Sequence, residues 1–218
     1  MASVQTRTSL ILGIVAGVLG LATALMWRLT SSRRPLPCTP ALSWLLESRV
    51  MGRVAGSELL IERAGVTPGM RVLDAGCGSG RLTVSVAHRV GPQGEVEALD
   101  VRPAALARVQ RELAREGLSN VRLVQAALGQ GSLETEHFDR ALLVAVLGEI
   151  LDQESALHEL YSALKPGGIL SVTEVLPDPH YQSRRAVRET AEKVGFRVET
   201  TAGTTWAHTT NLVRPPSD

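Results

Sequence analysis

Residues 70–175 alternate short apolar runs with amphipathic stretches of helical period, and this alternation limits the fold more than any other feature. The expected strands are "MRVLDAG" (70–76), "EVEALDV" (95–101), "VRLVQAAL" (121–128), "FDRALLVAVL" (138–147) and "ILSVTEVL" (169–176). The expected helices are "GRLTVSVAHRVG" (80–91), "RPAALARVQRELAREG" (102–117) and "DQESALHELYSAL" (152–164). Short strands that alternate with helices of this length pair in parallel, which predicts a doubly wound, Rossmann-like α/β sheet.

The pattern changes near the C-terminus. A helix is expected over residues 183–194, followed by the apolar stretches "FRVETT" (196–201) and "WAHTTNLV" (206–213) around "AGT". Two such stretches with a turn between them predict an antiparallel hairpin that closes one edge of the sheet.

The N-terminal part has a different character. Residues 10–27, "LILGIVAGVLGLATALMW", carry no charge over about 18 residues, close to the minimum for a helix that crosses a bilayer. We therefore expect a tail (1–9), a transmembrane helix (10–28), a linker (29–43), N-terminal helices (44–64) and the main domain (65–214). A cleaved signal peptide is the alternative, since Ala22-Thr23-Ala24 resembles a cleavage site.

Charges beside the apolar run predict its orientation. Arg28, Arg33 and Arg34 follow it and only Arg7 precedes it, so the positive-inside rule places the domain in the cytosol. Gly13 and Gly17 form a G-x-x-x-G pattern through which two such helices could pair as a homodimer, although small residues are common in membrane helices generally.

Charge and cysteine content exclude several classes of protein. Lys and Arg total 23 against 22 Asp and Glu, so no overall field favours nucleic acid. Cys38 and Cys77 lie far apart without the neighbouring ligands of a zinc site, so neither a metal centre nor a disulfide framework is expected.

The stretch "VLDAGCGSG" (72–80) follows the first expected strand and predicts the ligand site. Ligands of such sheets bind at the carboxyl ends of the strands, where the loop after the first strand meets them. Gly76, Gly78 and Gly80 remove side chains that would keep a ligand from the backbone. The helix that follows directs its free N–H groups toward the same place.

Two acids narrow the choice of ligand. Asp74 precedes the glycines, whose spacing is G-x-G-x-G rather than the G-x-G-x-x-G of dinucleotide sites. An acid there disfavours a pyrophosphate and favours a cationic nucleoside, which indicates S-adenosylmethionine. Asp100 ends the second strand, where an acid accepts hydrogen bonds from ribose hydroxyls, a feature that NAD sites share.

The motifs "VLDAGCGSG", "ALD", "FDRALLVAVLGEI" and "LKPGGILSVTE" occur in the order found in class I S-adenosylmethionine-dependent methyltransferases. The chain resembles that family over about residues 55–213, in particular its ubiquinone/menaquinone branch. The resemblance implies seven strands with the last antiparallel. It also implies that the ribose lies on Asp100 and the adenine on Val101.

By the same resemblance the methionine moiety lies against Asp74 and the loop glycines, with Cys77 as a small spacer among them, and Ala145 borders its methionine end. One position departs from the family pattern. The third strand commonly ends in an acid that receives the adenine amino group, and this chain has Ala127 there. The contact must then come from the backbone near Leu128 or from Gln125, and losing one neutral hydrogen bond costs only about 0.5–1.5 kcal/mol.

Candidate catalytic groups lie at the ends of later strands. Methyl transfer from a sulfonium is an in-line displacement that needs no metal, and it needs a base only if the acceptor is a hydroxyl or a carbon acid. Glu149, His180 and Tyr181 are the candidates, with Glu174 also at a strand end. The alternative roles of Glu149 are to cap the following helix or to bind the cofactor's ammonium group, and His180 and Tyr181 are otherwise ordinary loop residues.

These observations predict a membrane-anchored methyltransferase that acts on a lipophilic or small-molecule acceptor. Tethering favours such an acceptor because it concentrates the enzyme at the surface where the substrate resides. The alternatives are a non-catalytic binding module with the same fold and a nicotinamide-dependent oxidoreductase.

Overall fold

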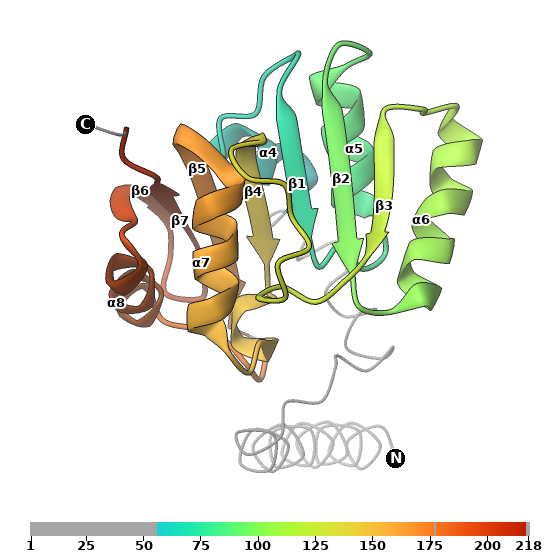
Figure 1. Ribbon diagram of the computed structural model, residues 1–218. Coiled ribbons are helices and arrows are strands. Elements are labelled where there is room, and N and C mark those ends of the chain that lie inside the picture. The colour runs from blue at the N-terminus through green and yellow to red at the C-terminus, as the bar shows by residue number, and fades with distance from the viewer. Residues whose placement is uncertain (1–55, 177, 217–218) are drawn as a thin grey trace, which may run out of the picture. The chain divides into compact units, whose positions relative to one another are not determined.

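The computed structural model describes residues 56–176 and 178–216. These residues form one seven-stranded sheet with the order β3-β2-β1-β4-β5-β7-β6 (Figure 1). The strands are β1 Arg71–Ala75, β2 Glu95–Asp100, β3 Val121–Gln125, β4 Phe138–Val144, β5 Leu164–Val175, β6 Arg197–Gly203 and β7 Ala207–Val213. The helices are α4 Ser57–Arg63, α5 Arg81–Val90, α6 Pro103–Glu116, the 3₁₀ turn η1 Leu147–Glu149, α7 Gln153–Ala163 and α8 Arg184–Val194.

The predicted α/β sheet with a closing hairpin is confirmed. Strands β1 to β5 pair in parallel, while β7 is antiparallel to both β5 and β6. The chain adds β2 and β3 on one side of β1 and then returns to add β4 on the other. The strand order therefore reverses between β1 and β4, which is where ligands of such sheets bind.

Three strands differ from their expected bounds by three residues or more, and one of them, β4, ends at Val144 rather than at Leu147. Strand β5 begins at Leu164 rather than at Ile169, because Leu164 pairs with Phe138 across a register shift in β4. Strand β3 ends at Gln125 rather than at Leu128. Of the N-terminal helices expected over residues 44–64, the structure describes only α4, and the rest of that prediction lies outside the described residues.

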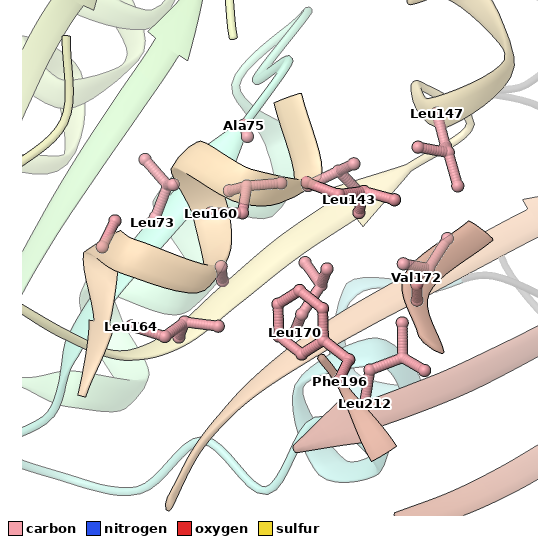
Figure 2. Packing of buried hydrophobic residues seen from close by; sticks show 14 of the residues in the cluster. Leu73, Ala75, Leu143, Leu147, Leu160, Leu164, Leu170, Val172, Phe196 and Leu212 are labelled. Carbon is pink, nitrogen blue, oxygen red and sulfur yellow. The ribbon is translucent and has the colours of Figure 1, made fainter. Parts of the chain in front are cut away.

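Helices cover both faces of the sheet. Alternation along the strands sends Leu73 toward the large core beneath α7 and α8, and sends Val72 toward the core beneath α4 and α5. Figure 2 shows the large core, in which Leu143, Leu170 and Phe196 pack together. Burying each such side chain stabilises the fold by about 1.5–3 kcal/mol, so the two cores hold the sheet rigid beneath its loops.

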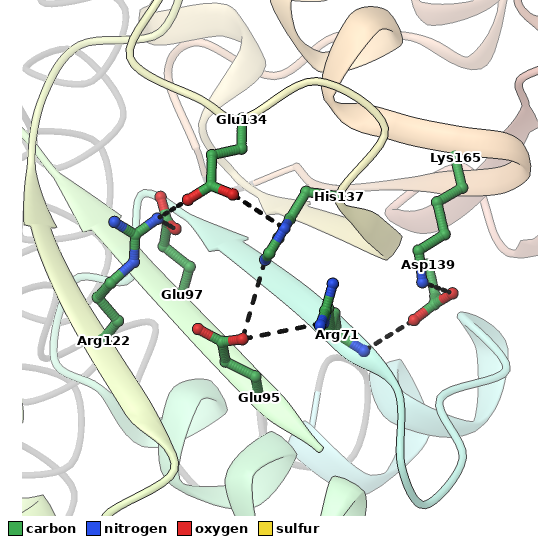
Figure 3. A network of polar contacts seen from close by, with 8 residues as sticks. All are labelled: Arg71, Glu95, Glu97, Arg122, Glu134, His137, Asp139 and Lys165. Atoms are coloured by element: carbon green, nitrogen blue, oxygen red, sulfur yellow. Dashed lines mark hydrogen bonds and ion pairs between the residues drawn. The ribbon is translucent and has the colours of Figure 1, made fainter. Parts of the chain in front are cut away.

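A polar network joins the amino ends of the strands, and so lies at the opposite end of the sheet from the expected site (Figure 3). His137 lies between Glu134, 3.1 Å away, and Glu95, 3.8 Å away. Arg122 pairs with the buried Glu97. These charged groups form ion pairs with one another, so we assign them a structural role rather than a role in ligand binding.

The prediction of a transmembrane helix over residues 10–28 lies outside the described residues. Within residues 56–176 and 178–216, no helix combines the length and the apolar character needed to cross a bilayer.

Candidate functional site

The loop after β1 packs tightly against the loop after β4. Gly76 has φ +80°, and a Cβ placed there would lie 2.5 Å from Cγ2 of Val146. Gly80, the N-cap of α5, has φ +82°, and a Cβ there would lie 2.9 Å from Val109. Both positions therefore require glycine for backbone conformation and for space. Gly78 has φ +53°, and a Cβ placed there would meet no atom of the described residues closer than 3.8 Å, so this is the open side of the loop in that part of the chain.

Asp100 connects the end of β2 to this loop. Its carboxylate is buried at 3% exposure and accepts the Gly78 N–H at 3.0 Å. It also accepts three hydrogen bonds from Arg102, from the backbone N–H at 2.9 Å and from Nε and Nη2 at 3.0 Å each. Burial alone would raise the pKa of Asp100, but the donors from Arg102 and Gly78 outweigh it and hold the pKa below its ordinary value. Asp100 is thus an anion fixed against the glycine loop.

Asp74 is a second buried acid at the same place. Its carboxylate accepts the Thr83 hydroxyl at 2.6 Å, beneath the first turn of α5. Burial raises its pKa to about 6, and the charge of Asp100 adds to the rise. A cationic ligand would relieve this repulsion, whereas a phosphate would add to it.

The side chain of Cys77 does not line the site. It packs in a core cluster with Ala98, Val109 and Leu113, beneath the loop. Burial raises the pKa of the thiol, which keeps it neutral and unreactive. Cys77 therefore contributes to the loop through its backbone, whose N–H donates to the Leu99 carbonyl at 3.0 Å.

The groups expected around an adenine lie at the ends of β2 and β3. Val101 directly follows Asp100 and is 53% exposed, which is unusual for a large apolar side chain and suits a flat ring. Gln125 donates from Nε2 to the Val101 carbonyl at 3.4 Å. Ala127 lies in the loop after β3. The side chain of Leu128 packs against the large core, so Leu128 would contact a ligand through its backbone.

Sequence reasoning missed the residue that holds this loop. Glu159 of α7 accepts backbone N–H groups from Gly129, Gln130, Ser132 and Leu133. A carboxylate that gathers four backbone donors fixes the loop after β3. No local pattern announces this role, because Glu159 lies some 30 residues from its partners on what reads as an exposed helix face.

At the end of β4 the backbone is strained. Ala145 has φ +54°, a conformation that costs a residue with a Cβ about 1–2 kcal/mol. Its N–H donates to the Thr173 carbonyl at 2.9 Å, which ties it to β5. Such strain concentrates at functional sites, and it directs the chain toward the Gly76 loop.

A buried polar cluster lies at the end of β5, next to this strained turn. Glu174 is 1% exposed, accepts the Gln182 N–H at 3.1 Å through Oε2, and has no hydrogen-bond partner for Oε1 among the residues the structure describes. Its pKa rises to about 8, mainly through burial and further through the charges of Asp178 and Glu149. It is therefore protonated at neutral pH and can release its proton just above it.

The three predicted catalytic residues, Glu149, His180 and Tyr181, differ in how they lie relative to Glu174. Glu149 ends η1 close enough to raise the pKa of Glu174. The backbone of His180 packs so closely on η1 that a Cβ at Gly148 would collide with the His180 carbonyl oxygen. Tyr181 donates its hydroxyl to the Thr205 carbonyl at 2.9 Å, while its ring packs edge-on against that of His208, with 5.6 Å between the ring centroids. The prediction of their catalytic roles stays a prediction.

His208 of β7 completes the cluster. It pairs with Glu174 across the two strands, and its Nε2 lies 3.0 Å from the Gln182 carbonyl. Burial lowers its pKa, so the ring is neutral. Asn211, from the same strand, instead donates to the Arg63 carbonyl at 2.6 Å. Trp206 is 70% exposed.

Comparison with known proteins identifies the family to which this site belongs. The family model described as "Methyltransferase domain" matches residues 66–213. The ubiquinone/menaquinone biosynthesis C-methyltransferase UbiE of Shewanella sediminis is 35% identical over 126 residues, which cover 57% of this chain and 50% of that protein. The same enzyme of Shewanella oneidensis is 36% identical over 126 residues, with the same shares. The matched region thus spans about half the length of these curated relatives.

Solved structures share the fold. A SAM dependent methyltransferase from Aquifex aeolicus superposes with a TM-score of 0.72 at 21% identity, covering 80% of this chain and 98% of that one. The phosphoethanolamine N-methyltransferase 2 of Haemonchus contortus, solved with S-adenosyl-L-methionine, gives 0.64 at 18% identity, covering 73% and 52%.

Proposed function

The chain belongs to the methyltransferase domain family, whose model matches most of its length, and from this premise we propose that it transfers a methyl group from S-adenosylmethionine to a lipophilic acceptor of the quinol type. The observation that carries the proposal is Asp100, a buried anion at the end of β2 that is hydrogen-bonded to the glycine loop. An acid at this point of a doubly wound sheet receives the hydroxyls of a ribose.

The residues around Asp100 fit S-adenosylmethionine. The open side of the loop at Gly78 admits a ligand to the backbone, and the exposed Val101 offers an apolar face to the adenine. Asp74 and Asp100 make the site anionic, which suits a ligand with a sulfonium and an ammonium group. When bound, this cofactor supplies an electrophilic methyl group. Ala145 and Val146 would border its methionine end.

The acceptor class rests on two observations. The relatives from Shewanella are named for ubiquinone and menaquinone biosynthesis and for methylation of carbon. Residues 10–28 of this chain have the composition of a membrane helix. A tethered enzyme meets acceptors that partition into the bilayer at high local concentration, and a reduced quinone ring with an apolar tail is such an acceptor.

Glu174 supplies the base that such an acceptor needs. Its Oε1 has no hydrogen-bond partner within residues 56–176 and 178–216, so an acceptor hydroxyl would take that position. The ionised form of Glu174, which is the minor form at neutral pH and predominates above about pH 8, accepts the hydroxyl proton, and this raises the electron density on the ring carbon that receives the methyl group. As the ring carbon takes the methyl group, the bond from that methyl to the sulfonium would break and leave S-adenosylhomocysteine. The carbon would then lose its own proton to solvent, and the ring would become aromatic again.

The domain faces the cytosol and is held at the membrane by residues 10–28. The support is the arginine excess at Arg28, Arg33 and Arg34 after the apolar run. Protease treatment of sealed inverted vesicles should digest the domain, whereas in right-side-out vesicles the domain should be protected. The reverse pattern, or release of the full chain by alkaline carbonate, would contradict this topology.

Methyl transfer is tested with full-length protein in detergent micelles, methyl-labelled S-adenosylmethionine and a 1,4-naphthoquinol that carries an isoprenoid tail. Mass spectrometry should find the labelled methyl on a ring carbon with the wild type and not with Asp100→Ala. Glu174→Gln should bind the cofactor and fail to transfer, whereas Glu154→Gln, the same change on the exposed side of α7, should transfer normally. Cofactor binding without transfer to this quinol or to any lipid extract would refute the proposed acceptor class.

A further inference from the structure

The carboxylate of Asp100 has no acceptor position left for a ribose. A carboxylate accepts about four hydrogen bonds, two at each oxygen. Oδ1 already accepts from the backbone N–H and Nε of Arg102, at 2.9 and 3.0 Å. Oδ2 already accepts from Gly78 N–H and Arg102 Nη2, both at 3.0 Å. Two of these four donors are backbone groups that stay in place, so only the Arg102 side chain can make room.

The position of Arg102 is unusual for its residue type. Arg102 is the N-cap of α6, where Ser, Thr, Asp or Asn would cap the helix, and its side chain makes no capping bond. The side chain of Arg102 instead turns back toward Asp100, two residues earlier, and its planar guanidinium donates to both carboxylate oxygens as a two-pronged fork. The guanidinium is 39% exposed while the carboxylate beneath is 3% exposed, so the fork covers Asp100 on its solvent side.

We propose that Arg102 occupies the ribose subsite of the free protein and is displaced from Asp100 by the cofactor's hydroxyls, so that it sets the affinity for S-adenosylmethionine. This inference rests on the proposed function, because it takes Asp100 as the ribose acceptor. Displacement exchanges two hydrogen bonds between oppositely charged groups for two bonds from uncharged hydroxyl donors to the same carboxylate, which weakens cofactor binding relative to a site without the arginine. A guanidinium next to the sulfonium and ammonium of the cofactor opposes binding further.

The effect should be moderate. A partly exposed arginine pair contributes far less than a buried one, because solvent screens it. Removing the fork should therefore tighten cofactor binding by about three- to tenfold. The nucleoside alone should show a smaller gain, since it carries the two hydroxyls but not the positive charges that the guanidinium repels.

Titration calorimetry on the full-length protein tests the inference with two ligands, S-adenosylmethionine and adenosine. Arg102→Ala should bind both more tightly than the wild type. Arg102→Lys keeps the charge but cannot form the two-pronged contact, so it should gain affinity for adenosine. Arg111→Ala removes the same charge from the exposed side of α6 and should leave both affinities unchanged. Circular dichroism confirms that each variant is folded.

A second readout follows Asp100 itself. Carbon-detected NMR of the Asp100 carboxyl should show its pKa rising in Arg102→Ala, and the Arg102 Nε–H signal of the wild type should shift when adenosine binds. Weaker or unchanged binding by a folded Arg102→Ala would overturn the inference while leaving the proposed function intact. Failure of the wild type and all variants to bind S-adenosylmethionine would instead refute the proposed function, and this inference with it.

Discussion

Replacing Glu174 by Gln should change how the stability of the protein depends on pH. The wild-type carboxyl has a pKa of about 8 when folded, against an ordinary value of 4.5. Between these values the folded state holds a proton that the unfolded state has lost, so stability is fully present below pH 4.5 and is lost as pH rises through 8. The full difference of about 3.5 pH units corresponds to about 5 kcal/mol, as an order of magnitude.

The part that can be measured cleanly lies between pH 6.5 and 8. Over this interval the free energy of unfolding of the wild type should fall by roughly 1.5 kcal/mol relative to that of Glu174→Gln. Other buried acids, such as Asp74, titrate alike in both proteins and cancel in the difference. Urea unfolding of the full chain in a non-ionic detergent, followed by circular dichroism at several pH values, measures it.

The matched control is Glu154→Gln, which makes the same chemical change on an exposed residue of α7. Its difference from the wild type should stay flat across the same interval. Parallel curves for the wild type and Glu174→Gln would show that Glu174 ionises at its ordinary pKa. The burial argument, and with it the role of Glu174 as a base that titrates near pH 8, would then be wrong.

Two further predictions concern the loops around the cofactor. Gly76→Ala should lower the free energy of unfolding by at least about 1–2 kcal/mol, because the new Cβ meets Val146 and the left-handed backbone disfavours alanine. In Gly78→Ala the new Cβ meets no close atom of the described residues, so this change should cost only the backbone part. Equal losses of stability in the two variants would contradict this reasoning. Glu159→Ala should leave four backbone N–H groups without their acceptor, so hydrogen exchange at Gly129–Leu133 should quicken while exchange in β1 stays unchanged. Unchanged exchange in that loop would show that Glu159 does not hold it.

The fold was predictable from the sequence because its main signals are local. Apolar period, glycine stops such as Gly117 and the order of the motifs place each strand and helix to within a few residues. The early start of β5 was not predictable, because it depends on the pairing of Leu164 with Phe138 across the sheet. The insertion of β7 between β5 and β6 is likewise a matter of long-range pairing.

The candidate site was predictable at its first loop and less so elsewhere. Asp74 and Asp100 lie in the last two positions of β1 and β2, and the glycines follow β1 directly, so the sequence alone brings them together. The environment of Glu174 depends on His208 and Gln182, which reach it from other elements. The fork of Arg102 on Asp100 depends on a side-chain conformation that no spacing reveals. Cys77 lies in the predicted loop, yet its side chain points into the core.

The most direct test of the account is whether the loop after β1 is a specific site for S-adenosylmethionine. Calorimetric titration of the full-length protein should give saturable binding of one equivalent, displaced by S-adenosylhomocysteine and unaffected by excess NAD. Asp100→Ala, which removes the ribose acceptor, should weaken that binding by at least tenfold, which corresponds to about 1.4 kcal/mol. Displacement by NAD, or equal affinity in Asp100→Ala, would contradict the central claim.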